Sequence, residues 1–129
     1  MKDIARDYFE EACILTKAGK FNGAASRLYY ALYRAIVAIF EERGIKQSDL
    51  TPKVDPENHK YWLHEVVRNF APLAGVERRD ASFVRDVWVL RRRADYEVPR
   101  IKEADIRSYL RIVKRILADL EIETCEVPK

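Results

Sequence analysis

The segment Leu-Arg-Arg-Arg-Ala-Asp-Tyr at 90–96 holds the densest group of side chains that could do chemistry. Its three successive guanidinium groups can bind phosphate or carboxylate through paired hydrogen bonds. Near the end of an expected helix, they also interact favourably with the negative end of the helix dipole. Arg91 and Asp95 are four residues apart, which places them on one side of a helix that continues that far. We expect both to face the groove formed with the helix at about 21–43, near Arg27 and Tyr30. Two interpretations stay open: a solvated basic turn, or an anion site in which Arg92 and Arg93 bind the ligand.

A second segment, Ala-Ala-Ser-Arg-Leu-Tyr-Tyr-Ala-Leu-Tyr at 24–33, combines small residues with three tyrosines. Small residues let a neighbouring helix approach closely, and each tyrosine offers apolar area and a hydroxyl group. Arg27 and Arg34 are expected on one face of this helix, with Tyr30 between them. The segment is either a buried helix with tyrosines in the core or a polar groove in which Arg27, Tyr30 and Arg34 bind a ligand.

Other catalytic patterns are absent from the sequence, which has no glycine-rich phosphate loop, no nucleophile elbow and no paired-cysteine motif. His59 and His64 are five residues apart, whereas metal-binding pairs on a helix are usually four apart. We therefore expect no metal and no cofactor, and His64 to be a surface or packing residue. Cys13 and Cys125 lie far apart in sequence, and we expect both to be free thiols, in the core and in the tail respectively.

The positive charge of the chain is concentrated in one stretch. Residues 1–77 have no net charge, residues 78–115 carry +6, and residues 116–129 carry −3. An anionic partner is therefore expected to bind residues 78–115, where Arg107, Arg111 and Lys114 form a further basic stripe. The longest apolar-rich stretch, at 35–40, is too short to span a membrane. We expect a cytoplasmic protein without a membrane partner.

The hydrophobic periodicity predicts one all-α domain over 1–129, an antiparallel up-and-down bundle with its core at about 3–122. Five helices are expected, at about 3–18, 21–43, 56–70, 80–93 and 103–122, with Asp80 as the cap of the fourth. The third should begin at Asp55-Pro56-Glu57, which offers a capping carboxylate followed by proline. The helix at 21–43 is apolar nearly all round and should be the central one. Residues 45–55 are a predicted linker, and residues 123–129 a tail.

Together, Ala-Ala-Ser-Arg-Leu-Tyr-Tyr-Ala at 24–31, the later histidine-containing helix and Leu-Arg-x-x-Ala-Asp-Tyr at 90–96 resemble the HEPN family. The resemblance is to its small stand-alone prokaryotic members and covers roughly residues 3–120. It implies a helical bundle that forms a homodimer. It also implies a possible partner, because many members are encoded beside a minimal nucleotidyltransferase and act with it as a toxin–antitoxin pair.

Many HEPN proteins are metal-independent RNases whose motif is an arginine, four to six residues, and a histidine, assembled across a dimer. Arg91 matches the arginine, but Tyr96 stands five positions later, and no histidine follows His64. Tyrosine does not normally titrate near neutral pH. We therefore expect a nucleotide- or RNA-binding protein. The alternatives are an RNase that uses Arg91 with Asp95, Tyr96 or a displaced histidine, and a protein-interaction module without nucleic acid.

Overall fold

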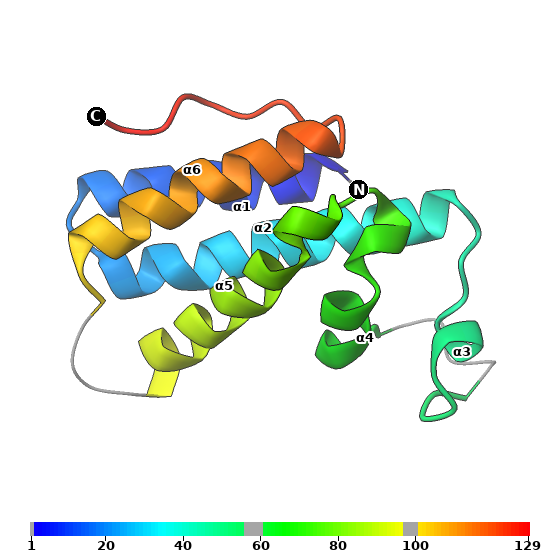
Figure 1. Cartoon of the computed structure of the whole chain (residues 1–129). Helices are drawn as coiled ribbons and strands as arrows, with labels where there is room; N and C mark the ends of the chain where they lie inside the picture. Colours follow the sequence, from blue (N-terminus) through cyan, green and yellow to red (C-terminus); the bar gives the residue numbers. More distant parts are fainter. Residues whose placement is uncertain (1, 56–60, 97–100) are drawn as a thin grey trace.

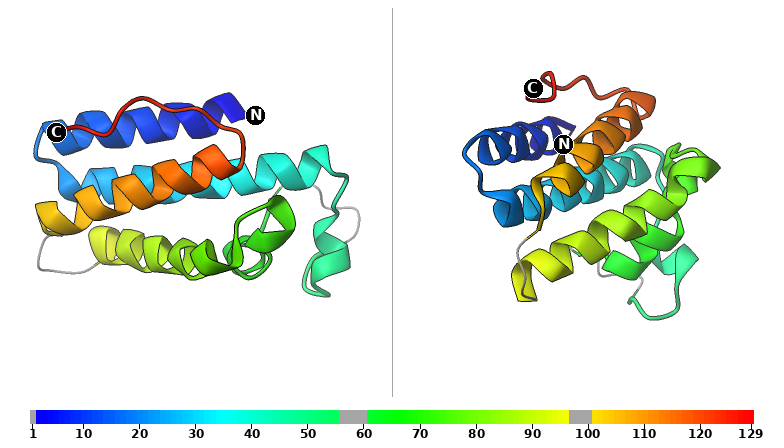
Figure 2. Two further views of the ribbon diagram at one scale, coloured as in Figure 1. Left: turned by 45° about the horizontal axis from the view of Figure 1, so that its top comes forward. Right: turned by 60° about the vertical axis from the view of Figure 1, so that its left-hand side comes forward.

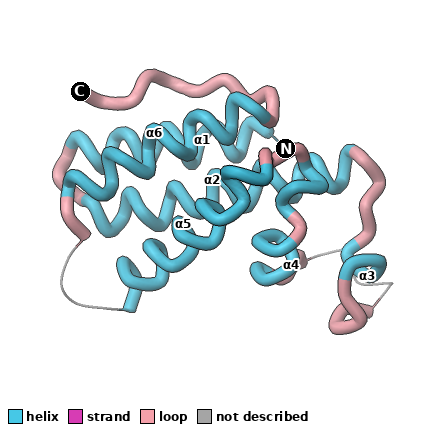
Figure 3. The backbone as a smooth tube through the Cα atoms, in the orientation of Figure 1, coloured by secondary structure: helices cyan, strands magenta, loops and turns pink. Residues whose placement is uncertain are grey.

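The computed structural model describes residues 2–55, 61–96 and 101–129, and within these every regular element is a helix (Figures 1 and 3). The elements are α1 (Lys2–Lys17), α2 (Phe21–Glu42), α3 (Gln47–Leu50), α4 (His64–Asn69), the 3-10 helix η1 (Ala71–Ala74), α5 (Arg78–Tyr96) and α6 (Glu103–Asp119). The predicted all-α bundle is confirmed. None of the described helices is long and apolar enough to cross a bilayer.

Helix α2 is the centre of the bundle, as its apolar circumference predicts. Its buried residues extend from Ala24 to Phe40, and it packs against α1, α4, α5, α6 and η1. Helix α1 runs antiparallel to it, and α5 crosses its opposite side (Figure 1). Gly19 closes the turn between α1 and α2 with a φ of 74°, a left-handed conformation that costs glycine little.

The region between α2 and α5 differs from the prediction. The expected linker contains α3, and the expected helix at 56–70 is reduced to α4, preceded by extended backbone. The buried Gln47 side chain donates to the Tyr61 carbonyl at 2.7 Å and accepts from the Leu63 amide at 2.6 Å. Because these backbone groups bond to a side chain from α3, they are not used in a helix. The predicted start at 56–57 lies outside the described residues.

Helix α5 is longer than predicted at both ends and includes residues 91–96. Asp80 lies inside its first turn rather than at the cap. There Asp80 is 1% exposed and pairs with Arg115 of α6. This contact of the buried Asp80 carboxylate joins the first turn of α5 to α6. Arg91 lies toward the other end of α5, where it contacts α2.

Residues 123–129, expected as a tail, run back along α1 and α6 (Figure 2). Arg6 donates to the carbonyl of residue 123 at 2.8 Å, and Arg107 donates to the Pro128 carbonyl at 2.7 Å. Lys114 donates to the carbonyls of residues 124 and 125 at 3.0 and 2.8 Å. Pro128 is buried. The tail is therefore an attached part of the bundle, and we call residues 123–129 the C-terminal strap.

Candidate functional site

Three helices bring a group of polar and aromatic side chains together at one side of α2. We call the residues of this group the arginine–histidine cluster; they are Tyr29, Tyr30, Tyr33, His64 and Arg91. Tyr29 and Tyr33 are one helical turn apart, so both face α4, while Tyr30 faces α5. The cluster thus combines three phenols, one imidazole and one guanidinium from elements that are distant in sequence.

His64 begins α4 and lies against two of these tyrosines. Its Nδ1 atom is 2.5 Å from the Tyr29 hydroxyl oxygen, and its ring centroid is 4.9 Å from that of Tyr33. If the hydroxyl donates, the neutral imidazole carries its proton on Nε2. If Nδ1–H donates instead, Nε2 keeps a free lone pair. The tautomer of His64 therefore decides whether Nε2 can accept a proton.

The charge states of the cluster follow from burial and from neighbouring cations. Burial, followed by the positive charges of Arg91 and Arg68, lowers the pKa of His64 below its ordinary value of 6.5. Burial is also the main cause that raises the pKa values of Tyr29 and Tyr33. At neutral pH His64 is accordingly a neutral imidazole, and Tyr29 and Tyr33 are protonated phenols.

Arg91 reaches from α5 to α2. Its Nη2 atom donates to the Tyr30 hydroxyl at 3.1 Å, and its Nε atom is 3.0 Å from a carboxylate oxygen of Asp95. The guanidinium carbon lies 5.2 Å from the ring centroid of Tyr30 and 5.7 Å from that of Tyr29. These contacts confirm that Arg91 and Asp95 are within reach of each other and that Arg91 faces α2.

The contact between Arg91 and Asp95 is an ion pair without an aligned hydrogen bond from Nε. That nitrogen is buried, and among the described residues no acceptor is aligned with it, although the whole side chain remains 18% exposed. A buried donor without an aligned acceptor costs free energy. Because Nε itself is buried, a ligand would have to reach Arg91 through the exposed part of its side chain.

Two more guanidinium groups lie beside the cluster, both over the ring of Trp88. The Arg68 guanidinium is 3.7 Å from the ring centroid, and that of Arg92 is 5.1 Å from it. We call Arg68, Arg91 and Arg92 the arginine patch. Cation–π contacts hold a guanidinium by its face and leave its N–H groups at the edge available.

The other predicted site residues are not part of this group. Arg27 pairs with Glu11 of α1 at 2.9 Å instead of joining Arg91. Arg34 lines a cavity of about 250 Å³ that adjoins the cluster through Tyr30 and Tyr33 and is otherwise lined by residues of α1, α2 and the segment before α4. The side chain of Tyr96, at the end of α5, lies outside what the structure describes.

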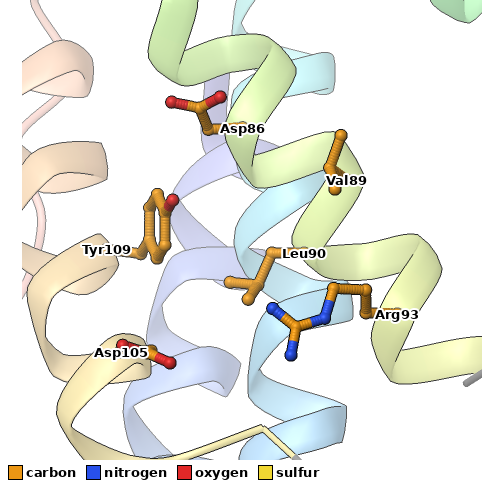
Figure 4. A pocket seen from close by; sticks show the side chains of 6 residues that line it. All are labelled: Asp86, Val89, Leu90, Arg93, Asp105 and Tyr109. Carbon is orange, nitrogen blue, oxygen red and sulfur yellow. The ribbon is translucent and has the colours of Figure 1, made fainter. Parts of the chain in front are cut away.

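Arg93 points away from the cluster, into a pocket of about 320 Å³ between α5 and α6 (Figure 4). Tyr109 of α6 projects into this pocket, with Asp86 and Asp105 on either side of it. Burial and these two carboxylates raise the pKa of Tyr109. With two acids facing one arginine, this pocket is unsuited to phosphate.

The predicted basic stripe of α6 is also different from the expectation. Arg107 and Lys114 both donate to carbonyls of the C-terminal strap. Arg111 remains exposed. Carbonyl oxygens of the strap therefore accept hydrogen bonds from Arg107 and Lys114, two residues that the charge distribution predicts to bind an anion.

His64 is the site residue that the sequence interpretation missed. It is 35 residues from Tyr29 and 27 from Arg91, and no local spacing connects them. The signal that came closest is the turn-spaced pair Tyr29 and Tyr33, because a buried phenol needs a polar partner. The sequence does not identify that partner as His64.

A comparison with curated proteins finds a distant similarity to a UPF0332 protein of Thermotoga maritima. The two chains are 24% identical over 118 residues, which cover 91% of this chain and 83% of that protein. No family model matches the chain. No solved structure matches it either.

Proposed function

We propose that this protein binds single-stranded RNA through the arginine patch and the adjoining arginine–histidine cluster. The observation that carries the proposal is the environment of Arg91, which is partly exposed and lies beside two further arginines. Asp95 is the carboxylate paired with this patch, through Arg91. Together, the three arginines and Asp95 have a net charge of +2. The HEPN resemblance supports the same function.

The chemistry of the patch suits a phosphate chain with exposed bases. Guanidinium groups bind phosphate oxygens through two parallel hydrogen bonds, and aromatic rings can stack with unpaired bases. Trp88 and Tyr30 are partly buried and lie next to these donors. A single strand, which offers both phosphates and unpaired bases, therefore suits this surface.

The resemblance adds a homodimer and a minimal nucleotidyltransferase partner to the proposal. The aromatic residues that could form a dimer contact are largely packed in the core of one chain. Tyr29 and Trp62 are buried, and Tyr30, Tyr33 and Trp88 are partly buried. The dimer therefore rests on the resemblance, and light scattering that gives the mass of one chain at micromolar concentration would contradict it.

The binding test compares two arginines of α5. Replacing Arg91 with Ala should weaken the binding of a labelled single-stranded RNA about tenfold or more, as expected for a lost charge-assisted contact. Arg85→Ala is the matched control, because Arg85 is an exposed arginine of the same helix and its loss changes the net charge equally. Fluorescence anisotropy at fixed salt measures both. Equal losses would mean that only total charge matters and would reject the site.

A second candidate function is a metal-independent RNase in which His64 replaces the histidine expected at Tyr96. A neutral imidazole beside Arg91 offers a proton acceptor and a positive charge that can stabilise a phosphorane-like transition state. This route needs the tautomer in which Nδ1–H donates to Tyr29, because Nε2 is then free to take the proton of a 2′-hydroxyl.

A cleavage assay with excess chelator separates binding from turnover. We expect the purified protein to bind the RNA without rapid cleavage. Tyr96 stands where the family's histidine is expected, and a Tyr29 hydroxyl that donates to Nδ1 leaves the imidazole proton of His64 on Nε2. Rapid cleavage that disappears in both His64→Ala and Arg91→Ala, but persists in Tyr96→Phe, would establish the RNase instead. Circular dichroism should show that each variant keeps its helical content.

A further inference from the structure

Two thiols at opposite ends of the sequence meet on the side of the molecule away from the arginine patch. Cys13, on α1, and Cys125, in the C-terminal strap, have their sulfur atoms 3.6 Å apart although 112 residues separate them. Both are free cysteines, with Cys13 buried and Cys125 exposed. Neither takes part in the proposed RNA site.

The bonds around Cys125 keep its sulfur near Cys13. Lys114 holds the carbonyls of Thr124 and Cys125, and Arg107 holds that of Pro128. A disulfide bond is about 2.05 Å long, so the two sulfurs must approach by about 1.5 Å. Cys125 lies outside any helix with its side chain exposed, so rotation of that side chain can supply the movement without unfolding α1.

We propose that Cys13 and Cys125 are a reversible disulfide site that fastens the C-terminal strap to α1 under oxidising conditions. A hydroperoxide is the oxidant. The Cys125 thiolate attacks one oxygen of hydrogen peroxide, the O–O bond breaks, and Cys125 becomes a sulfenic acid; hydroxide leaves and combines with the proton lost by the Cys125 thiol to form water. The Cys13 sulfur then attacks the Cys125 sulfur, the S–O bond breaks, and water leaves with the proton of Cys13. Two thiols and hydrogen peroxide thus yield one disulfide and two waters.

The environments of the two sulfurs set this order of events. Burial, then the contact with Cys125, raises the pKa of Cys13 to about 12, so Cys13 is protonated at neutral pH. The exposed Cys125 is the sulfur that an oxidant reaches first. Lys114 and Lys17 lie close enough to favour the thiolate of Cys13 when it attacks the sulfenic acid. A dithiol reductant reverses the reaction by attacking the exposed sulfur.

The disulfide would also determine whether the basic residues of α6 are available. A strap linked to α1 keeps its carbonyls on Lys114 and Arg107. A reduced strap is held by hydrogen bonds and can be released. Oxidation would therefore fix the covered form of this surface, whatever the arginine patch binds.

The test treats the full chain with a small molar excess of hydrogen peroxide and reads the intact mass. We expect the loss of two hydrogen atoms, a tryptic cross-link between the peptides containing Cys13 and Cys125, and full reversal by dithiothreitol. The melting temperature of the oxidised protein should rise by about 5 °C or more, since the link closes a long loop. Carboxypeptidase should remove the strap more slowly from the oxidised form.

Two variants keep the result interpretable. Cys125→Ser changes an exposed side chain, and it should abolish both the cross-link and the rise in melting temperature. Cys13→Ala tests the buried partner, and there peroxide should drive Cys125 to higher oxidation states. Disulfides only between chains, or a Cys125 sulfinic acid in the wild-type protein while Cys13 remains a free thiol, would overturn the proposal.

Discussion

The arginine patch of α5 and the basic stripe of α6 carry the same sign of charge but use their donors differently. On α6, Arg107 and Lys114 donate to carbonyls of the strap at 2.7 to 3.0 Å. On α5, Arg92 stands over the ring of Trp88, and the Arg91 side chain is partly exposed beside it. A carbonyl uses up a donor, whereas a ring contact leaves it available. The availability of a donor, more than its charge, thus distinguishes a binding surface from a structural one.

The largest expected effect tests this difference with matched double variants. Arg91→Ala with Arg92→Ala should weaken RNA binding strongly and reduce the salt slope by about 1.4, or about 0.7 for each lost phosphate contact on a single strand. Arg107→Ala with Lys114→Ala removes the same charge and should leave the slope nearly unchanged. Anisotropy titrations over a range of salt concentrations measure both slopes. Equal reductions would show that the two surfaces do not differ.

Removing the strap should make the two surfaces more alike. A chain ending at Ile122 frees the donors of Arg107 and Lys114 and removes two acidic residues and one lysine, a net loss of one negative charge. RNA affinity should therefore rise about threefold, the scale of a weak surface ion pair. Its melting temperature should fall by several degrees because the hydrogen bonds of the strap are lost. Adding Lys114→Ala to the shortened chain should return the affinity towards that of the full chain. A shortened chain with unchanged affinity would contradict the covering role of the strap.

A smaller effect concerns the hydroxyl that holds Arg91. Tyr30→Phe removes the acceptor of Arg91 Nη2 and should lower the free energy of unfolding by about 1 kcal/mol, the usual value of one such hydrogen bond. Urea unfolding followed by circular dichroism measures the change. RNA affinity should fall by less than in Arg91→Ala, because the guanidinium itself remains. A Tyr30→Phe loss equal to that of Arg91→Ala would assign the binding contact to the phenol.

The smallest effect is a pH dependence that belongs to the cluster alone. Because the pKa of His64 is lower in the folded state, the unfolded chain takes up the proton first as the pH falls below 6.5. The wild-type free energy of unfolding should therefore decrease from pH 7 towards the lower folded-state pKa. Above that window, His64 contributes no pH dependence. His64→Gln should flatten this part of the profile, and a parallel decrease in the variant would assign it to other groups.

The helices that pack along α2 could be predicted from the sequence because their apolar residues recur at helical spacing. Helices α1, α2 and α6 begin and end within a few residues of their predicted limits. Local rules failed where a long-range bond decides the backbone, as Gln47 does for residues 61–63. They also placed Asp80 at a helix cap, whereas its partner Arg115 holds it inside α5.

The candidate site could also be predicted only in part. The spacing of Arg91 and Asp95 predicts their contact, since four residues make about one turn of helix. The position of His64 depends on how a six-residue helix packs against α2, and sequence spacing contains no record of it. The two cysteines are similar, because their free state could be predicted from the sequence but their proximity depends on the path of the strap.

The strap also has a consequence for the order in which the parts of the bundle assemble during synthesis. The strap residues that bond to Arg6 and lie against Cys13 follow them in the chain by 117 and 112 residues. A nascent chain can assemble α1 and α2 as a helical hairpin early, but the face of α1 that carries Cys13 stays uncovered until the strap has been synthesised. The Cys13 thiol is therefore open to reaction during that interval and becomes protected only when the strap closes over it.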